Sequence, residues 1–400
     1  MLLTNIQLCY TYSMKQETLI EKCNRFLDET MNLNDLPGLA IGVLVGGADG
    51  GSNQPAEFVG VRGYRDYLAR VPLREDDIFH CASVSKLFTS TAIMKLVEVG
   101  ALRLGDRLRD LLPDLHIADQ RFQEIRLWNM LTHTSGLGDV SDYHWYDFET
   151  DADSLRCYVY ESAEVLEQPM LWDPQGSPKP PDAKASRFRY SNVAYEILGQ
   201  IVAEYSDRMP DADGKLSYED FVACYLLEPA GMTDSTMKTF ERTGAPEFLT
   251  NRRMAQPYEK KADRSIGPVD DYPYTRQHAP SSTLTANVGD LLRWGRAHLT
   301  SARGGGPLLK AETYQTIWRD YATVPNNGEK MGIGWFMREQ TVESNGVSRT
   351  YHLCGHEGTD DGFRASFWIC PELDLVTVVL SNLSGAPVKR INKKLFHVIV

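Results

Sequence analysis

The stretch Phe79-His80-Cys81-Ala82-Ser83-Val84-Ser85-Lys86-Leu87-Phe88-Thr89 decides how the rest of the chain is interpreted. It places Ser83 three residues before Lys86, where an apolar, helix-like pattern begins. Residues i and i+3 share one face of a helix, so we expect the Ser83 hydroxyl and the Lys86 amine to meet. A helix N-terminus also offers unpaired N–H groups and a positive dipole end, which suit a serine nucleophile and its oxyanion. Because the same spacing is common on solvated helix faces, the other motifs must decide.

Composition sets the broad class of the protein. The 400 residues, of which 42% are hydrophobic and 24% charged, are typical of a globular protein with two or three domain-sized units. Asp and Glu number 54 against 42 Lys and Arg, so the balance is acidic and disfavours binding to a phosphate backbone or an anionic membrane. We therefore expect no nucleic-acid or membrane partner, and nothing in the composition indicates an oligomeric state.

Cysteine usage and the N-terminal stretch indicate the compartment. The seven cysteines are odd in number and scattered, without a C-x-x-C pair, as expected for reduced thiols in the cytoplasm. Met1–Ser13 lacks the basic segment of a signal peptide, and we expect residues 1–13 to be a disordered N-terminal extension, with Met14 as an alternative start. No apolar run approaches the ~20 residues that span a bilayer.

The order of predicted elements indicates an α+β fold. Apolar periodicity and turn residues predict these elements in chain order: a helix over 14–30, strands at 39–45 and 58–61, a helix from Ser83 to near Gly100, mostly helical structure to about 278, a helix at 288–299, strands at 332–336, 350–358, 362–369 and 375–380, and a closing helix at 386–400. Strands near both ends of the chain favour one antiparallel sheet flanked by helices. The predicted units are a sheet domain over 14–100 plus 280–400 and an inserted, mostly helical domain over 101–279.

Two further motifs accompany Ser83 and Lys86. Tyr190-Ser191-Asn192 precedes a helical run, and His356-Glu357-Gly358 ends a predicted strand and is followed by Thr359. Singly, a Tyr-x-Asn motif is most often a capped helix start, and a His-x-Gly motif is most often a turn at a strand end.

In this order the three motifs resemble those of the serine β-lactamase and penicillin-binding-protein superfamily, in particular its class C β-lactamase-related, esterase-like branch. The related class A set is S-x-x-K, S-D-N and K-T-G; here the middle motif has the Tyr-x-Asn form and the third is His-x-Gly. Residues 131–137, 227–236 and 332–336 are also similar to segments of the family. The resemblance implies a β-lactamase/transpeptidase-like fold.

The resemblance also assigns the chemical roles. Ser83 would be the acylated nucleophile, and Lys86 a general base or proton relay whose pKa is lowered by burial and positive neighbours. Tyr190 would share the proton transfer, with the charge of Lys86 stabilising its phenolate. Asn192 would hold the acyl side of the substrate and steady Lys86.

The third motif would complete the substrate site. The backbone N–H groups of Ser83 and Thr359 would form the oxyanion hole. His356, in the place of the family's lysine, would contact substrate and support Tyr190, and Gly358 would belong to the same substrate-binding strand end.

Histidine at position 356 changes the expected substrate. The lysine of the family supplies a fixed positive charge for a carboxylate, whereas histidine is only partly charged near neutrality. Glu357, Asp360 and Asp361 make the local field still less favourable to an anion, although Arg364 could compensate. Esters or amides of neutral or cationic substrates are therefore favoured over β-lactams.

We expect no metal and no cofactor. His352 and His356 alternate with Cys354, but four strand residues separate the histidines by ~13 Å, too far for one ion. The chain also lacks a G-x-S-x-G elbow, a Walker A motif and G-x-G-x-x-G.

The leading hypothesis is a serine hydrolase that acts on a small-molecule acyl substrate, a carboxylic ester or small amide, through an acyl-enzyme on Ser83. The alternatives are an acyltransferase that uses the same acyl-enzyme, a D-amino-acid peptidase, a weak β-lactamase, and a catalytically silent binding protein on the same fold.

Overall fold

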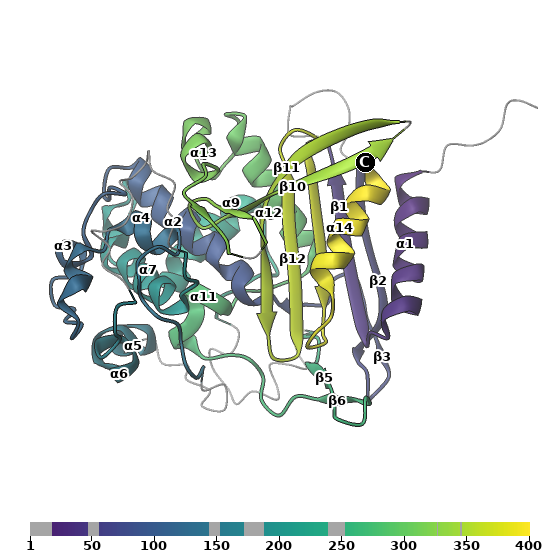
Figure 1. The fold of residues 1–400 in the computed structure, drawn as a ribbon, viewed down its shortest axis with the longest axis horizontal. Coiled ribbons are helices and arrows are strands. Elements are labelled where there is room, and N and C mark those ends of the chain that lie inside the picture. The colour runs from purple at the N-terminus through teal and green to yellow at the C-terminus, as the bar shows by residue number, and fades with distance from the viewer. Residues whose placement is uncertain are drawn as a thin grey trace, which may run out of the picture.

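A computed structural model describes residues 18–46, 56–143, 153–171, 188–238, 253–325, 327–344 and 346–400. Within these ranges the dominant feature is an antiparallel sheet with strand order β3-β2-β1-β13-β12-β11-β10-β9-β8 (Figure 1). Its strands are β1 (Gly38–Val45), β2 (Ala56–Asp66), β3 (Val71–Pro72), β8 (Ala322–Thr323), β9 (Lys330–Met331), β10 (Phe336–Ser344), β11 (Val347–Asp360), β12 (Phe363–Cys370) and β13 (Leu375–Ser381). Short pairs form between β4 (Phe79–His80) and β7 (Thr285–Ala286), and between β5 (Tyr258–Lys260) and β6 (Ile266–Pro268).

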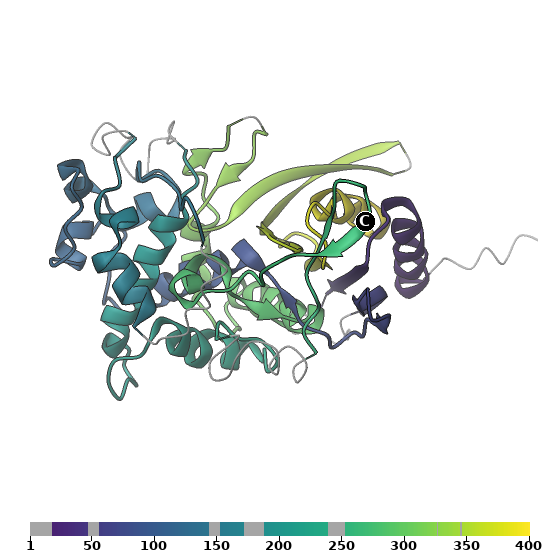
Figure 2. The same ribbon diagram turned by 90° about the horizontal axis from the view of Figure 1, so that it is seen from below.

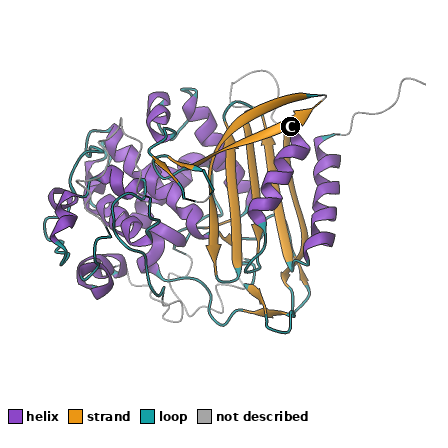
Figure 3. Cartoon of the chain, viewed as in Figure 1, coloured by secondary structure: helices purple, strands orange, loops and turns teal. Residues whose placement is uncertain are grey.

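Helices cover both faces of the sheet. The terminal helices α1 (Leu19–Asn34) and α14 (Val388–Ile399) lie side by side on one face, and the remaining helices lie beyond the other face (Figures 1, 2 and 3). The latter are α2 (Ser85–Glu98), α3 (Leu108–Leu111), α4 (Leu127–Leu131), α5 (Ser154–Glu161), α6 (Ala163–Leu166), α7 (Asn192–Tyr205), α8 (Tyr218–Val222), α9 (Glu228–Ala230), α11 (Ala279–Ser282), α12 (Val288–Ala302) and α13 (Ala311–Ile317).

The central strand β1 shows why this arrangement follows from the sequence. Leu39, Ile41 and Val43 pack into the cluster beneath α1 and α14, whereas Ala40 and Leu44 pack into the cluster on the helical side. A strand covered on both faces needs apolar residues at every position, which explains the unbroken apolar run. β1 pairs with β13 on one side and with β2 on the other, so the two ends of the chain close one sheet.

The predicted α+β class, an antiparallel sheet flanked by helices, is confirmed, and most predicted strands and helices occur within a few residues of their expected limits. The strand expected at 332–336 is wrong for residues 332–335, which form a bend between β9 and β10. Gly334 has φ +78 there, in the left-handed region that favours glycine, and its N–H donates to the Leu131 carbonyl instead of to a neighbouring strand. The closing helix begins at Val388 instead of residue 386.

The division into a sheet domain and an inserted helical domain stays a prediction. The 1–13 extension, most of the aromatic 139–150 loop and the proline-rich 173–182 loop lie outside the described residues. Among the helices that are described, none combines the length and apolar character needed to cross a membrane.

Candidate active site

Ser83 lies in a short 3₁₀ turn, Ala82–Val84, that leads directly into α2. The turn is held from both sides by Ser85, whose hydroxyl donates to the Ala82 carbonyl at 2.7 Å and accepts from the Leu284 N–H at 2.9 Å. Ala82 itself has φ +48, in the left-handed region that non-glycine residues rarely adopt. Ser83 is therefore presented by a constrained turn.

Lys86 places its amine on the Ser83 hydroxyl, as the i, i+3 spacing predicts. Its Nζ donates to Ser83 Oγ at 3.2 Å, to Asn192 Oδ1 at 2.5 Å and to the Ser281 carbonyl at 2.9 Å. An ammonium has three donors, so these contacts use all of them. The protonated form of Lys86 is thus fully hydrogen-bonded, and its side chain is fully buried.

Burial lowers the pKa of Lys86 to about 8. Three acidic residues, Glu196, Asp139 and Asp360, act in the opposite direction. The predicted lowering is present, but its cause is loss of solvation and not a set of positive neighbours. At neutral to mildly alkaline pH a substantial fraction of Lys86 is an uncharged amine that can accept a proton.

Tyr190 lines the same cavity as Ser83 and stacks on His133, with ring centroids 4.3 Å apart. The Lys86 amine lies 4.9 Å from the centre of the Tyr190 ring. Burial raises the pKa of Tyr190 well above its ordinary value, and the nearby Ser83 hydroxyl opposes this only in part. A resting phenolate, as the resemblance implied, is therefore disfavoured, and Tyr190 starts as a neutral phenol.

Asn192 is fixed at the first turn of α7. The preceding Ser191 caps this helix, accepting from the Ala194 N–H at 3.1 Å. The backbone and side-chain N–H groups of Asn192 both donate to Asp139 Oδ1 at 2.8 Å, which turns the amide oxygen toward Lys86. Asn192 thus steadies Lys86 in the geometry that was predicted.

His356 is neutral in this environment. Its Nδ1 lies 2.6 Å from the Glu357 carbonyl, and because a carbonyl only accepts, the proton is on Nδ1. The Nε2 is buried without a partner among the described residues, and burial lowers the pKa of His356 to about 3. The fixed positive charge of the family's third motif is therefore missing at this position.

Gly358 brings the end of β11 against the turn that carries Ser83. A Cβ atom at this position would lie 2.2 Å from the Cys81 carbonyl oxygen, closer than any real contact. Only glycine allows this approach, which puts the next residue, Thr359, at the edge of the cavity that Ser83 lines.

The predicted residues meet around one cavity of about 400 Å³. It is lined by Ser83, Tyr143, Phe188, Tyr190, Asn192, Val324, Asn327, Glu329, Phe336, His356, Glu357, Thr359, Asp360, Trp368 and Lys389. Lys86 lies beneath Ser83, and Gly358 lies on the strand below Thr359. Arg364 faces elsewhere, donating to the Asp360 and Phe363 carbonyls beside a neighbouring hollow, so it does not supply the missing charge.

Several supporting residues were not found from the sequence. His133 lies in the family-like segment 131–137 and has φ +55. Its Nδ1 accepts from the Ser191 N–H at 3.1 Å, and its ring stacks on the Tyr190 ring. Asp139, which orients Asn192, is an exposed loop residue without a motif of its own. The pair His80–Asp360, at 2.7 Å, joins residues 280 positions apart.

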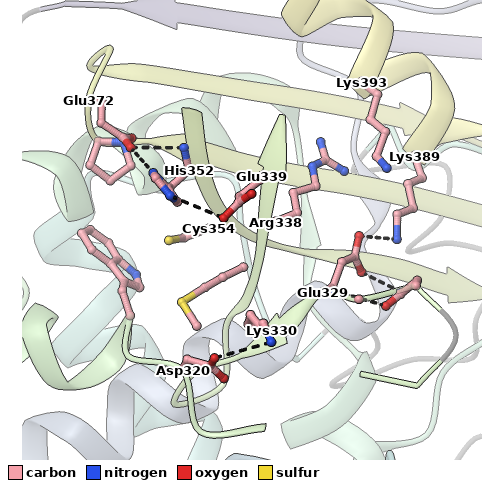
Figure 4. Close-up of a pocket in the computed structure, with 15 residues that line it drawn as sticks. Asp320, Glu329, Lys330, Arg338, Glu339, His352, Cys354, Glu372, Lys389 and Lys393 are labelled. Atoms are coloured by element: carbon pink, nitrogen blue, oxygen red, sulfur yellow. Dashed lines mark hydrogen bonds and ion pairs between the residues drawn. The ribbon is translucent and has the colours of Figure 1, made fainter. Parts of the chain in front are cut away.

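A larger cavity, of about 820 Å³, adjoins the one that contains Ser83 (Figure 4). Asn327, Glu329 and Lys389 line both. Its charged groups largely pair with one another: Lys389 with Glu329 at 2.6 Å, Lys330 with Asp320 at 3.6 Å, and His352 with Glu372 at 2.8 Å. Ser83 thus lines the smaller of the two cavities.

The sequence matches the model of the Beta-lactamase family over residues 24–398. The chain belongs to the Beta-lactamase family. The predicted superfamily is thereby confirmed, and family membership supports a serine hydrolase in general without fixing the substrate.

Individual proteins similar to this chain include a penicillin-binding protein, an amidase and a β-lactamase. It is 28% identical over 353 residues to Penicillin-binding protein 4 of Amycolatopsis lactamdurans, covering 87% of this chain and 81% of that protein. The D-amino acid amidase of Ochrobactrum anthropi, solved with L-phenylalanine amide, superposes with a TM-score of 0.68 at 18% identity, covering 94% of this chain and 97% of the amidase. A class C β-lactamase of Rhodobacter sphaeroides superposes with a TM-score of 0.64 at 20% identity, covering 94% and 98%. The fold is therefore that of the β-lactamase and penicillin-binding-protein group.

Proposed function

We propose that this protein is a serine hydrolase that forms an acyl-enzyme on Ser83 and acts on carboxylic esters or small amides. The observation that carries the proposal is the 3.2 Å contact between Ser83 Oγ and a buried Lys86 Nζ whose pKa is about 8. A buried amine with a lowered pKa is a suitable base for an adjacent hydroxyl.

In the acylation step, the uncharged amine of Lys86 takes the proton of Ser83 Oγ while Oγ bonds to the substrate carbonyl carbon. The carbonyl oxygen becomes an oxyanion, which the N–H groups of Ser83 and Thr359 would stabilise. As the oxyanion collapses, the leaving group takes the phenolic proton of Tyr190, and Lys86 returns its proton to Tyr190. The products are the Ser83 ester and the free alcohol or amine.

Deacylation repeats the sequence with water. The Lys86 amine, through Tyr190, takes a proton from water as its oxygen attacks the acyl carbon, and Ser83 Oγ leaves with that proton. Asn192 would hold the acyl-side amide or carbonyl, while His356 and Gly358 would shape the strand against which the substrate lies.

The absence of charge on His356 supports neutral or cationic substrates over β-lactams. The same acyl-enzyme could transfer its acyl group to an amine or alcohol, and the fold similarity to a D-amino acid amidase supports amides as a substrate class. A weak β-lactamase and a catalytically silent binding protein are the remaining alternatives. We also propose a cytoplasmic enzyme, because the seven cysteines are odd in number and scattered along the sequence.

The proposal is tested by intact mass after incubation with a fluorophosphonate and with a penicillin. We expect the wild type to gain one fluorophosphonate adduct and the Ser83→Ala variant to gain none. The control is Ser265→Ala, a change of an exposed serine on the turn between β5 and β6, which should label like the wild type. Absence of a Ser83-dependent adduct with both reagents would favour the silent binding protein.

Rates on p-nitrophenyl esters, D-amino-acid amides and nitrocefin, each with and without an added amine or alcohol, then rank the activities. Esters and amides turned over faster than nitrocefin support the proposal. Product that appears only with the added acceptor would instead identify an acyltransferase.

A further inference from the structure

Asp360 is an acidic residue of the Ser83 cavity that contacts His80 and acts at longer range on Lys86 and Arg364. The acidic side chains that line this cavity are Glu329, Glu357 and Asp360. Glu329 is paired with Lys389 at 2.6 Å. Glu357 accepts from Trp368 Nε1 at 2.8 Å and lies 3.5 Å from Arg338. Asp360 has no lysine or arginine partner for its carboxylate among the described residues.

A buried histidine holds Asp360 in place. His80 Nε2 lies 2.7 Å from Asp360 Oδ2, and because a carboxylate only accepts, Nε2 is the donor. The His80 side chain is fully buried, and that of Asp360 is 8% exposed. The second oxygen, Oδ1, has no hydrogen-bond partner in the part of the chain that the structure describes, and Asp360 lines the cavity. One oxygen is thus anchored and the other is available to a ligand.

The surroundings of Asp360 also suit a cation. Aromatic rings line the same cavity: Tyr143, Phe188, Tyr190, Phe336 and Trp368. Burial is the main cause of the raised pKa of both Tyr143 and Tyr190, and the charge of Asp360 adds to it. Aromatic faces attract ammonium groups, and a neutral His356 does not repel them. The one lysine among the lining residues, Lys389, is neutralised by Glu329.

We propose that Asp360, positioned by His80, binds an ammonium group of the substrate, so that the preferred substrates are esters or amides whose acyl part carries a free amine. This assignment rests on the proposed acyl-enzyme on Ser83 and names the substrate class for that site. An ammonium that donates to Asp360 Oδ1 would form a charge-assisted hydrogen bond, and such bonds are among the stronger ones. Asp360 then determines specificity while Ser83 and Lys86 perform the chemistry.

The test compares two substrates that differ only in the amine. Alanine benzyl ester, as each enantiomer, and benzyl propionate share the scissile ester and the leaving alcohol, which is measured as it is released. For the wild type we expect kcat/KM to be at least ~10-fold higher for one alanine ester than for the propionate. Asp360→Asn should bring this ratio close to one. Because Asp360 also raises the pKa of Lys86, both rates can change in this variant, and the ratio between the two substrates is the quantity that tests the proposal.

The matched control is Asp361→Asn, which removes the same charge one residue away on the exposed turn and should keep the wild-type ratio. A parallel fall of both substrates in Asp360→Asn would show that Asp360 only positions the oxyanion-hole strand, and would overturn the proposal. An unchanged ratio in that variant would do the same.

A measurement on the wild type alone covers the case in which Asp360→Asn does not fold. Alaninamide should protect Ser83 from a fluorophosphonate at a concentration at least ~10-fold lower than propionamide, and equal protection would overturn the assignment. If the wild type forms no Ser83 adduct, the proposed function itself fails. If it hydrolyses benzyl propionate without preferring an alanine ester, only the role of Asp360 fails.

Discussion

The amide oxygen of Asn192 accepts a hydrogen bond from the amine of Lys86 at 2.5 Å, joining the first turn of α7 to the first turn of α2. Lys86 is buried, so its charge state depends on the few groups that surround it. Because the Asn192 amide is neutral, it orients Lys86 without adding charge. Substitutions of the groups around Lys86 should therefore change the pH dependence of the reaction.

The first prediction concerns pH. The base must be the uncharged amine, so kcat/KM should rise with pH up to the Lys86 pKa of about 8 and level off above it. Asn192→Asp places a negative charge beside the ammonium, which raises the pKa of Lys86. The rising limb of the plot of kcat/KM against pH should then move to higher pH. Glu196→Gln removes a negative charge that raises the same pKa and should move the limb to lower pH.

The rate of Ser83 labelling by a fluorophosphonate, followed from pH 6 to 10, gives the position of the rising limb for each variant. Asp213→Asn, a change in an exposed turn, is the control and should leave the limb in place. Shifts of the two charge variants in the same direction would contradict a role of Lys86 as base.

The second prediction concerns the oxyanion hole. In Gly358→Ala the added methyl group would lie 2.2 Å from the Cys81 carbonyl oxygen, so β11 must move away from the turn of Ser83. Displacing the Thr359 N–H should lower kcat/KM by ~10²–10³, the usual cost of losing one oxyanion donor. Steady-state kinetics measure the effect, and circular dichroism shows whether the sheet is retained.

Gly105→Ala is the matched control for this variant, because its nearest neighbouring atom would be 4.0 Å from the new methyl group. It should retain wild-type kcat/KM. A Gly358→Ala variant that is folded and fully active would show that the close approach of β11 is not needed for catalysis.

Short-range spacing predicted the contact between Ser83 and Lys86, because that contact is local to one helix turn. The places of Tyr190, Asn192 and His356 beside it followed from family resemblance. The pair His80–Asp360 was not predictable, since only the approach of β11 to β4 brings these residues together. The high pKa of Tyr190 was missed for a similar reason: burial in the folded chain, which spacing does not report, outweighs the nearby charge of Lys86.

The bend at 332–335 shows the same limit for the fold. Its apolar residues match a strand pattern, but Gly334 has a positive φ, and a Cβ atom there would collide with Ser90 of α2. The strands predicted correctly, such as β1 and β13, carry continuous apolar runs that burial on both faces requires. Local pattern therefore determines the sheet, and tertiary contacts determine the connections that complete the site.

The third prediction concerns substrate charge. His356→Lys introduces the positive charge that a neutral histidine lacks, and it should raise the rate of acylation by a penicillin, whose carboxylate it can bind, by ~10-fold. Burying the new ammonium should also lower the free energy of unfolding by about 1–3 kcal/mol. Stopped-flow or mass-spectrometric acylation rates and urea unfolding measure the two effects.

His352→Lys is the control for this change, because residue 352 lies on the same strand but is exposed and outside the Ser83 cavity. It should change neither quantity. An unaltered penicillin rate in a folded His356→Lys variant would show that charge at this position does not limit β-lactam recognition.

The fourth prediction concerns stability in acid. His298 is fully buried, its Nδ1 lies 2.9 Å from the Tyr314 hydroxyl, and burial lowers its pKa to about 3. Between pH 6.5 and 3 the unfolded chain binds a proton at this residue while the folded chain does not, so stability falls as the pH falls through this window. At pH 4 the loss from one such histidine is at most about 3 kcal/mol.

His298→Gln keeps a hydrogen-bonding group without titrating. Its unfolding free energy, from urea midpoints at pH 7 and 4, should fall less than that of the wild type. His352→Gln, at an exposed site, should follow the wild type; an equal fall in all three proteins would mean that His298 does not contribute to acid unfolding.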